Sequence, residues 1–237
     1  MTPDELKSWR KAERQRLVRE REALDAATLE RHRLRMDAAL ERSFPGLARG
    51  TVAFCWPIKG EYDPRYLART LRERGALTAL PVVVAPRQPL VFREWHPGVK
   101  LATGALDIPY PADSRELLPD AVLLPMNGWD GGGYRLGYGA GFFDRTLASL
   151  AKRPVVIGVS YEQAKMPTIH PQSWDIPVDW LVTERGVYRR DARRDGGKLE
   201  FLGEPPAGEP STLASPVCYA GEVAPGYFGD DQPRKSR

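Results

Sequence analysis

Short apolar runs recur along this chain and alternate with stretches of helical character. The runs read TVAFCW, LPVVVA, AVLLP, VVIGVS and WLVTE, at residues 51–56, 80–85, 121–125, 155–160 and 180–184. Runs this short predict buried strands rather than core helices, which need about ten residues or more. Because strands and helices alternate, we expect a three-layer α/β/α fold: an open, mostly parallel sheet with helices on both faces.

Four stretches have the composition of helices. Thr2 and Glu5 form a capping box with Pro3 between them, so a long charged N-terminal helix is expected. Further helices are predicted over residues 28–44, 64–74 and 142–152, which read TLERHRLRMDAALERSF, PRYLARTLRER and FFDRTLASLAK. The alternating run PLVFREW, at residues 89–95, indicates a less buried or edge strand.

The domain organisation follows from length and from a change of composition near residue 190. The chain has 237 residues, of which 42% are hydrophobic, enough for a substantial core. We expect a single α/β domain over residues 1–190. Residues 191–237 are rich in Gly and Pro and predict a partly extended or disordered extension, in which KLEFL, at residues 198–202, is a candidate edge strand.

Charge and cysteine content exclude several classes of protein. The net charge is only +4, and acidic and basic residues are interspersed, which suits an anionic small molecule as well as nucleic acid. Cys55 and Cys218 have neither a CxxC pattern nor metal-ligand spacing, so no disulfide framework or zinc site is expected. No apolar stretch approaches the roughly 20 residues of a membrane span. We therefore expect a cytoplasmic protein without a membrane segment.

The most unusual local feature is RLGYGAGFFDR, at residues 135–145, which lies between a predicted strand and a predicted helix. Gly137, Gly139 and Gly141 leave the backbone bare, so that several N–H groups can turn toward one anion, such as a phosphate, at the start of the helix. The spacing is neither that of a Walker loop nor that of the dinucleotide fingerprint. A close crossing of another backbone segment explains the glycines equally well.

The residues that flank the glycines favour a phosphate site. Arg135 offers a planar fork of donors for phosphate oxygens, and Asp144 offers a hard oxygen ligand to a magnesium ion. An acidic residue in the first turn of a helix also stabilises the helix dipole without any ligand. On position alone, that second interpretation of Asp144 is the favoured one.

At this point the sequence resembles a known family, the 5-formyltetrahydrofolate cyclo-ligases, also called 5,10-methenyltetrahydrofolate synthetases. RLGYGAGFFDR resembles the family's signature loop, RKAERQRLVREREAL its basic N-terminal helix, and GEYDPRYL its acidic substrate segment. LPVVVAPRQPLVFREWHPGVKLATGALDIPYP resembles the middle of the family pattern, and WDIPVDWLVTERGV its end. The resemblance covers roughly residues 8 to 190, in order.

The resemblance implies an ATP- and Mg²⁺-dependent enzyme that closes 5-formyltetrahydrofolate, with or without a polyglutamate tail, into 5,10-methenyltetrahydrofolate. The γ-phosphoryl group is transferred to the formyl oxygen, N10 attacks, and ADP and phosphate are released. Catalysis then consists mainly of positioning and of neutralising phosphate charge. No nucleophilic side chain is needed, in agreement with a sequence that shows no serine, cysteine or histidine constellation. A monomer or weak dimer that binds neither nucleic acid nor membrane is expected.

The resemblance also assigns roles to individual residues. The nucleotide would be bound by Arg10, Arg14, Arg135, Gly137, Gly139, Gly141 and Phe143, the magnesium ion by Asp144 and Asp175, and the folate by Glu61, Tyr138 and Phe142, with Arg135 and Asp144 acting in catalysis. Simpler interpretations exist for some of them. Charged helix residues usually face solvent, Asp175 fits a turn before Pro177, and Glu61 fits a plain loop. Trp56, Trp95 and Trp129 could stack on a ligand, but aromatic residues more often belong to the core.

Departures from the family pattern keep two other hypotheses open. Phe143 stands where the family usually carries a tyrosine, and Trp129-Asp130 where a phenylalanine-aspartate pair is expected. A paralogue that keeps the fold and the ATP loop but acts on another formyl, amide or carboxyl substrate is therefore the second hypothesis. A third, a non-catalytic nucleic-acid-binding module, conflicts with the acidic residues of the N-terminal helix, because such a module needs basic residues on one face.

Overall fold

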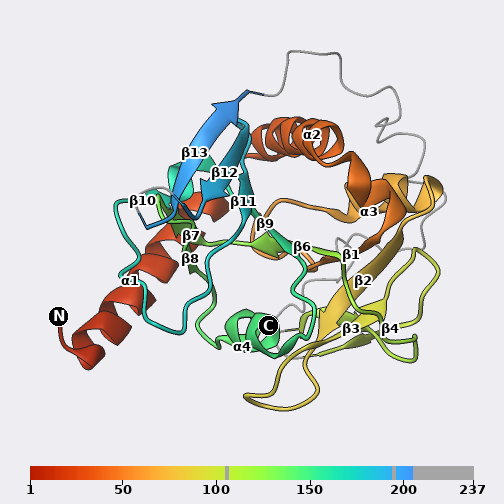
Figure 1. The fold of residues 1–237 in the computed structure, drawn as a ribbon, viewed down its shortest axis with the longest axis horizontal. Coiled ribbons are helices and arrows are strands. Elements are labelled where there is room, and N and C mark those ends of the chain that lie inside the picture. Colours follow the sequence, from red (N-terminus) through yellow and green to blue (C-terminus); the bar gives the residue numbers. More distant parts are fainter. Residues whose placement is uncertain (105–106, 194–195, 205–237) are drawn as a thin grey trace, which may run out of the picture. The chain divides into compact units, whose positions relative to one another are not determined.

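The computed structural model describes residues 1–104, 107–193 and 196–204, all within one compact unit. Among these residues, eight strands form a central sheet in the order β13-β12-β11-β9-β6-β1-β2-β3 (Figure 1). Its five inner strands are parallel: β2 (Leu77–Val82), β1 (Thr51–Phe54), β6 (Ala121–Pro125), β9 (Val155–Val159) and β11 (Trp180–Val182). Antiparallel strands complete the edges: β3 (Val91–Glu94) on one side, β12 (Val187–Asp191) and β13 (Lys198–Gly203) on the other.

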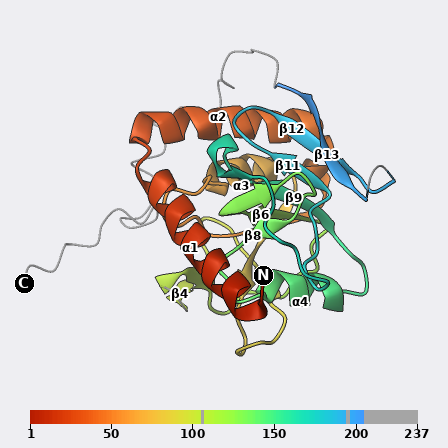
Figure 2. The same cartoon turned by 90° about the vertical axis from the view of Figure 1, so that its left-hand side faces the viewer.

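Helices cover both faces of the sheet, which confirms the predicted three-layer α/β fold. α2 (Ala26–Ser43) and α3 (Arg65–Glu73) lie on one side, and α4 (Phe142–Ser149) lies on the other (Figures 1 and 2). The long α1 (Pro3–Glu22) descends from the α2 side toward the level of α4 (Figure 2). The short 3₁₀ helices η1 (Pro45–Arg49) and η3 (Glu162–Ala164) join neighbouring elements. The predicted capping box starts α1, since the Thr2 hydroxyl accepts the Glu5 N–H at 3.3 Å and the Glu5 carboxylate accepts the Thr2 N–H at 2.6 Å.

The core follows the alternation of side chains along the inner strands. Val122 and Val156 share one buried cluster with Leu147 of α4 and Leu17 of α1. Ile157, which follows Val156 along β9, is also buried and faces the opposite layer, because successive strand residues point to opposite faces. The inner strands are thus apolar on both sides, as expected for a parallel sheet that helices cover.

Small strands outside the main sheet lie near residues 137–141, which we call the glycine loop. β7 (Gly128–Asp130) pairs with β8 (Arg135–Leu136) and with β10 (Lys165–Met166), and β4 (Leu101–Thr103) pairs with β5 (Pro109–Pro111). Strands of two or three residues are too short for a periodic pattern, so the sequence did not predict them. β8 leads directly into the glycines and thereby fixes where the loop begins.

Two expectations about strands can be compared with the structure. The strand predicted at residues 80–85 lies at Leu77–Val82 instead, and Val83 and Val84 are 43% and 53% exposed. The predicted bounds were wrong because the strand starts where it pairs with β1, and this pairing sets Leu77 opposite Thr51. The candidate edge strand at residues 198–202 is confirmed as β13.

The rest of the predicted extension, residues 205–237, lies outside the described residues. The boundary near residue 190 therefore stays a prediction. Within the part of the chain that the structure describes, no helix is both long and apolar enough to cross a bilayer.

Candidate active site

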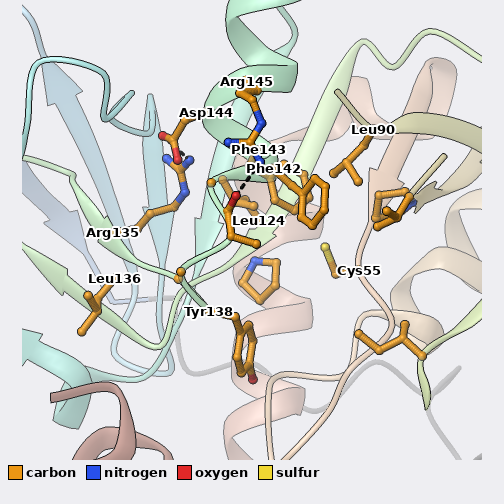
Figure 3. A pocket seen from close by; sticks show the side chains of 18 of the residues that line it. Cys55, Leu90, Leu124, Arg135, Leu136, Tyr138, Phe142, Phe143, Asp144 and Arg145 are labelled. Atoms are coloured by element: carbon orange, nitrogen blue, oxygen red, sulfur yellow. Dashed lines mark hydrogen bonds and ion pairs between the residues drawn. The ribbon is translucent and has the colours of Figure 1, made fainter. Parts of the chain in front are cut away.

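A pocket of about 990 Å³ opens where three parallel strands end. Trp56 follows β1, Val83 follows β2, and Pro125 ends β6, and all three line the pocket. The glycine loop and the start of α4 form the adjoining wall (Figure 3). Open α/β sheets collect ligands at this edge, beyond the carboxyl ends of their strands.

The structure brings together every residue that the sequence assigned to the site. The pocket is lined by Arg10, Arg14, Glu61, Arg135, Gly137, Tyr138, Gly139, Gly141, Phe142, Phe143, Asp144 and Asp175. Their individual roles stay predictions. Of the candidate stacking residues, Trp56 lines the pocket, whereas Trp95 and Trp129 are fully buried and belong to the core.

The glycine loop adopts backbone conformations that favour glycine. Gly139 has φ 96° and Gly141 has φ 64°, both in the left-handed region. A Cβ on Gly139 would also lie 3.0 Å from Cζ of Arg14, so the close neighbour at this glycine is a side chain and not the backbone segment that the alternative interpretation required. Gly141 caps α4 without a side-chain hydrogen bond, and the helix's first internal bond runs from Arg145 N–H to the Gly141 carbonyl at 3.2 Å. The N–H groups of the first helical turn therefore remain available to an anion.

Two arginine–carboxylate pairs hold neighbouring parts of the pocket wall. Arg135 Nη2 lies 2.6 Å from Asp144 Oδ1, and their side chains point toward one another in Figure 3. Arg10 Nη2 lies 2.7 Å from Asp175 Oδ2. The Ile176 N–H donates to Asp144 Oδ1 at 3.0 Å, and since Ile176 directly follows Asp175, the two carboxylates belong to one region of the site. Asp144 thus binds an arginine in addition to lying in the first turn of α4.

Arg14 and Arg145 have hydrogen-bonding capacity to spare. Arg14 donates from Nε to the Gly137 carbonyl at 2.7 Å, and its two terminal nitrogens have no partner among the described residues. Burial, followed by the nearby charge of Arg10, lowers the pKa of Arg14, so an anion here would relieve an unfavourable environment. Arg145 Nε is buried without a partner in the same described part of the chain. The sequence analysis missed Arg145, because an arginine in the first turn of a helix is usually exposed to solvent.

A second group of polar residues lies at the other end of the glycine loop. The Tyr138 hydroxyl donates to Glu61 Oε1 at 2.8 Å, and the Ile58 N–H donates to Glu61 Oε2 at 3.1 Å. Arg21 Nη2 lies 3.7 Å from Glu61 Oε1. Burial raises the pKa of Glu61, whereas Arg21 and the two hydrogen bonds oppose that rise. Figure 3 shows Tyr138 pointing away from the Arg135–Asp144 pair, so these two parts of the pocket are distinct.

Asp144 and Asp175 both line the pocket and offer carboxylate oxygens to a magnesium ion. The described residues contain no group of three or more His, Cys, Asp or Glu side chains that could enclose a metal. Mg²⁺, however, keeps several waters and is usually held by one or two carboxylates together with substrate phosphates. Asp144 binds protein donors through Oδ1 and Asp175 through Oδ2, and the other oxygen of each carboxylate has no hydrogen-bond donor among the residues that the structure describes. This donor set fits a magnesium ion that arrives with a phosphate ligand.

Comparison with known proteins assigns the chain to a family. A family model described as the 5-formyltetrahydrofolate cyclo-ligase family matches residues 6–184, most of the chain. The chain belongs to this family. The resemblance noted in the sequence is thereby confirmed.

Individual relatives of this cyclo-ligase family member agree with the assignment. The chain is 31% identical over 151 residues to 5-formyltetrahydrofolate cyclo-ligase of Escherichia coli K12, covering 61% of this chain and 83% of that protein. It is 32% identical over 146 residues to the cyclo-ligase of Mycolicibacterium smegmatis, covering 58% and 75%. The solved structure of Aquifex aeolicus 5,10-methenyltetrahydrofolate synthetase matches with a TM-score of 0.65 and 30% identity, over 81% of this chain and 97% of that one. Cyclo-ligases of this family are ATP-dependent and act on a folate.

Proposed function

We propose that this protein converts 5-formyltetrahydrofolate to 5,10-methenyltetrahydrofolate, using ATP and Mg²⁺ and releasing ADP and phosphate. One observation carries the proposal: a single pocket of about 990 Å³ combines spare cationic and backbone donors with a buried carboxylate. The donors suit phosphate, and the carboxylate of Glu61 suits the N–H groups of a folate ring. Family membership supports the same reaction.

At the phosphate end, protein groups hold and neutralise charge. Arg14 and the first turn of α4 contribute free N–H groups, and Arg135 adds a cation that Asp144 holds in place. Asp144 and Asp175 would hold the magnesium ion through their second oxygens. The metal supplies positive charge to the phosphates as the γ-phosphoryl group moves to the formyl oxygen. That transfer turns a poor leaving group into a good one, so that attack by N10 can release phosphate.

At the folate end, Glu61 has acceptor capacity left. Each of its oxygens accepts one short hydrogen bond, and a carboxylate offers about four acceptor sites. Glu61 is thus able to accept N–H groups of the folate ring while Tyr138 and Ile58 keep it in place. Tyr138 and Phe142 would flank the ring.

The remaining partner expectations belong to the same proposal. We infer a cytoplasmic protein, a monomer or weak dimer, that accepts folates with or without polyglutamate and binds no nucleic acid. Arg10 and Arg16 of α1 are engaged with Asp175 and Glu13, both at 2.7 Å, which leaves less of the cationic face that a nucleic acid would need.

A paralogous activity on another formyl, amide or carboxyl substrate is the second candidate. Phe143 favours it, because this side chain lines the pocket and packs partly against the core without a hydroxyl to offer. The reaction itself separates the two candidates.

The experiment follows the absorbance of methenyltetrahydrofolate formed by purified protein from 5-formyltetrahydrofolate and Mg-ATP. We expect turnover that stops when either ATP or magnesium is omitted. No product at high protein concentration, with ATP still bound in a binding assay, would reject the cyclo-ligase activity and favour the paralogue.

A further inference from the structure

Arg21, which the sequence analysis did not single out, is 5% exposed and links three segments to α1. Its Nε donates to the Lys59 carbonyl at 2.8 Å, and Nη1 donates to Asn127 Oδ1 at 2.8 Å. Nη2 donates to the Tyr138 hydroxyl at 3.1 Å and lies 3.7 Å from Glu61 Oε1. One guanidinium thus contacts the loop after β1, the residue that precedes β7 and the glycine loop.

Arg21 and Arg14 lie on the same face of α1, because seven residues make about two helical turns. They bind adjacent residues of the glycine loop: Arg14 binds the Gly137 carbonyl at 2.7 Å, and Arg21 binds the Tyr138 hydroxyl at 3.1 Å. The phosphate end and the Glu61 end of the pocket are therefore attached to one rigid helix through consecutive loop residues.

Asn127 fixes the orientation of the Arg21 guanidinium. Its Oδ1 accepts from Arg21, while its buried Nδ2 has no partner in the described part of the chain. Asn127, Arg21 and Glu61 also line a small cavity of about 10 Å³, which has room for one water molecule at most. The surroundings leave the guanidinium little freedom to turn away from Glu61.

We propose that Arg21 is a positioning residue, which holds Glu61 and Tyr138 ready for the folate and couples folate binding to occupation of the phosphate end. The inference rests on the proposed function. A ligand that orders the glycine loop would also order Tyr138, and Glu61 with it, because Tyr138 donates to Glu61 at 2.8 Å and Arg21 holds both side chains against α1. Each ligand would then strengthen the binding of the other.

The charge of Arg21 gives a second consequence. The titratable groups that face Glu61 are Arg21, Tyr138, Cys55 and Tyr161. Among them Arg21 is the cation, and it lowers the pKa of Glu61 against the larger effect of burial. Without Arg21, Glu61 takes up a proton at higher pH and loses acceptor capacity for folate N–H groups. The acidic limb of folate binding should then move to higher pH.

The test compares Arg21→Met and Arg21→Lys with Arg16→Met, a control on the exposed side of α1 where Arg16 is 43% exposed. Dissociation constants of 5-formyltetrahydrofolate are measured from pH 5 to 9, with and without a non-hydrolysable ATP analogue. For Arg21→Met we expect the affinity for 5-formyltetrahydrofolate to be at least about tenfold weaker. The acidic limb of folate binding should lie at higher pH. The ATP analogue should no longer strengthen folate binding. Affinity for the analogue alone should change less than about threefold.

Arg21→Lys keeps the charge but not the fork, so it should restore the acidic limb without restoring the strengthening by the analogue. It also provides a folded variant if Arg21→Met is unstable, which thermal melting would show. Weaker folate binding with an unchanged pH limb and intact coupling would overturn the inference and leave Arg21 a structural residue. If the unsubstituted protein itself fails to bind 5-formyltetrahydrofolate, the proposed function fails instead.

Discussion

Among the arginine–carboxylate clusters of the described residues, the one in the pocket and the one on α2 differ in which of their atoms are left to bind a ligand. On α2, Arg33 uses Nε and Nη2 for Glu30 and Nη1 for Asp37, at 2.5 to 2.9 Å. The second oxygen of Asp37 accepts the Tyr62 hydroxyl. In the pocket, by contrast, Arg14 donates a hydrogen bond from one nitrogen only, and Asp144 accepts hydrogen bonds through one oxygen only, among the described residues.

Unused donors and acceptors distinguish the pocket cluster from the structural cluster on α2. Short ion pairs occur in both, so their number says little about function. A cluster whose donors and acceptors all bind protein groups stabilises the fold, whereas one with unused donors and acceptors beside a pocket can bind a ligand. Substitutions in the pocket cluster should therefore lower activity, and substitutions in the α2 cluster should lower stability.

The largest effect is expected for Arg135→Ala in the pocket. Its guanidinium, 7% exposed, would be lost from the phosphate end, and kcat should fall about 1,000-fold, the scale of losing one group that stabilises transition-state charge. The methenyltetrahydrofolate assay measures it, with Arg153→Ala as control because Arg153 is 47% exposed and pairs with Asp179. A loss of tenfold or less in Arg135→Ala would remove this residue from the catalytic machinery.

The α2 cluster should respond in the opposite way. Arg33→Ala leaves Asp37 without its cation, so the free energy of unfolding should fall by about 3 kcal/mol while kcat/KM stays within about twofold. Urea denaturation gives the first quantity and the folate assay the second. The control is Arg31→Ala, whose arginine binds only the Thr28 hydroxyl among the described residues and should cost little. A large fall in kcat/KM with stability preserved would contradict the division between the clusters.

A smaller effect concerns the pH dependence of stability. Burial raises the pKa of Asp37 to about 7, even though Arg33 and Tyr62 oppose the rise. The folded state therefore holds this proton more tightly than the unfolded chain. The stability gained is complete below the unfolded pKa and is lost as pH rises through about 7.

Between pH 5 and 8 the free energy of unfolding should thus fall by about 2 to 3 kcal/mol, and Asp37→Asn should flatten that slope. Asp25→Asn serves as control. Hydrogen bonds from Thr28 lower the pKa of Asp25, so its titration lies below this window. An unchanged slope in Asp37→Asn would show that another group causes the pH dependence.

Local chemistry made parts of the molecule predictable from the sequence. The Thr2 capping box started α1, and the alternation of apolar runs and helices led to the α/β sheet. The glycine loop could be placed before a helix because FFDRTLASLAK follows it, and Arg135 and Asp144 at its flanks indicated a phosphate site. Glu61 and Asp175 came from family resemblance, since an isolated acid has no pattern of its own.

The rest depended on contacts between distant segments. Arg10 meets Asp175 across 165 residues, and Arg21 meets Asn127 across 106, distances over which no periodic pattern operates. Arg21 also lies between Glu20 and Glu22, where it looks like any residue of a charged helix. Likewise, the bounds of β2 were set by its pairing with β1 rather than by its own apolar residues.

α1 carries Arg10, Arg14 and Arg21 toward one pocket, and this limits which insertions and deletions the helix can accept. The helix rises about 1.5 Å per residue, so the outer two arginines stand about 16 Å apart along its axis. One residue inserted between them would turn one arginine by about 100° relative to the other and detach an end of the pocket. We therefore expect that a single-residue insertion or deletion between residues 10 and 21 of α1 disrupts the pocket, whereas this stretch can accept side-chain replacements at its exposed positions.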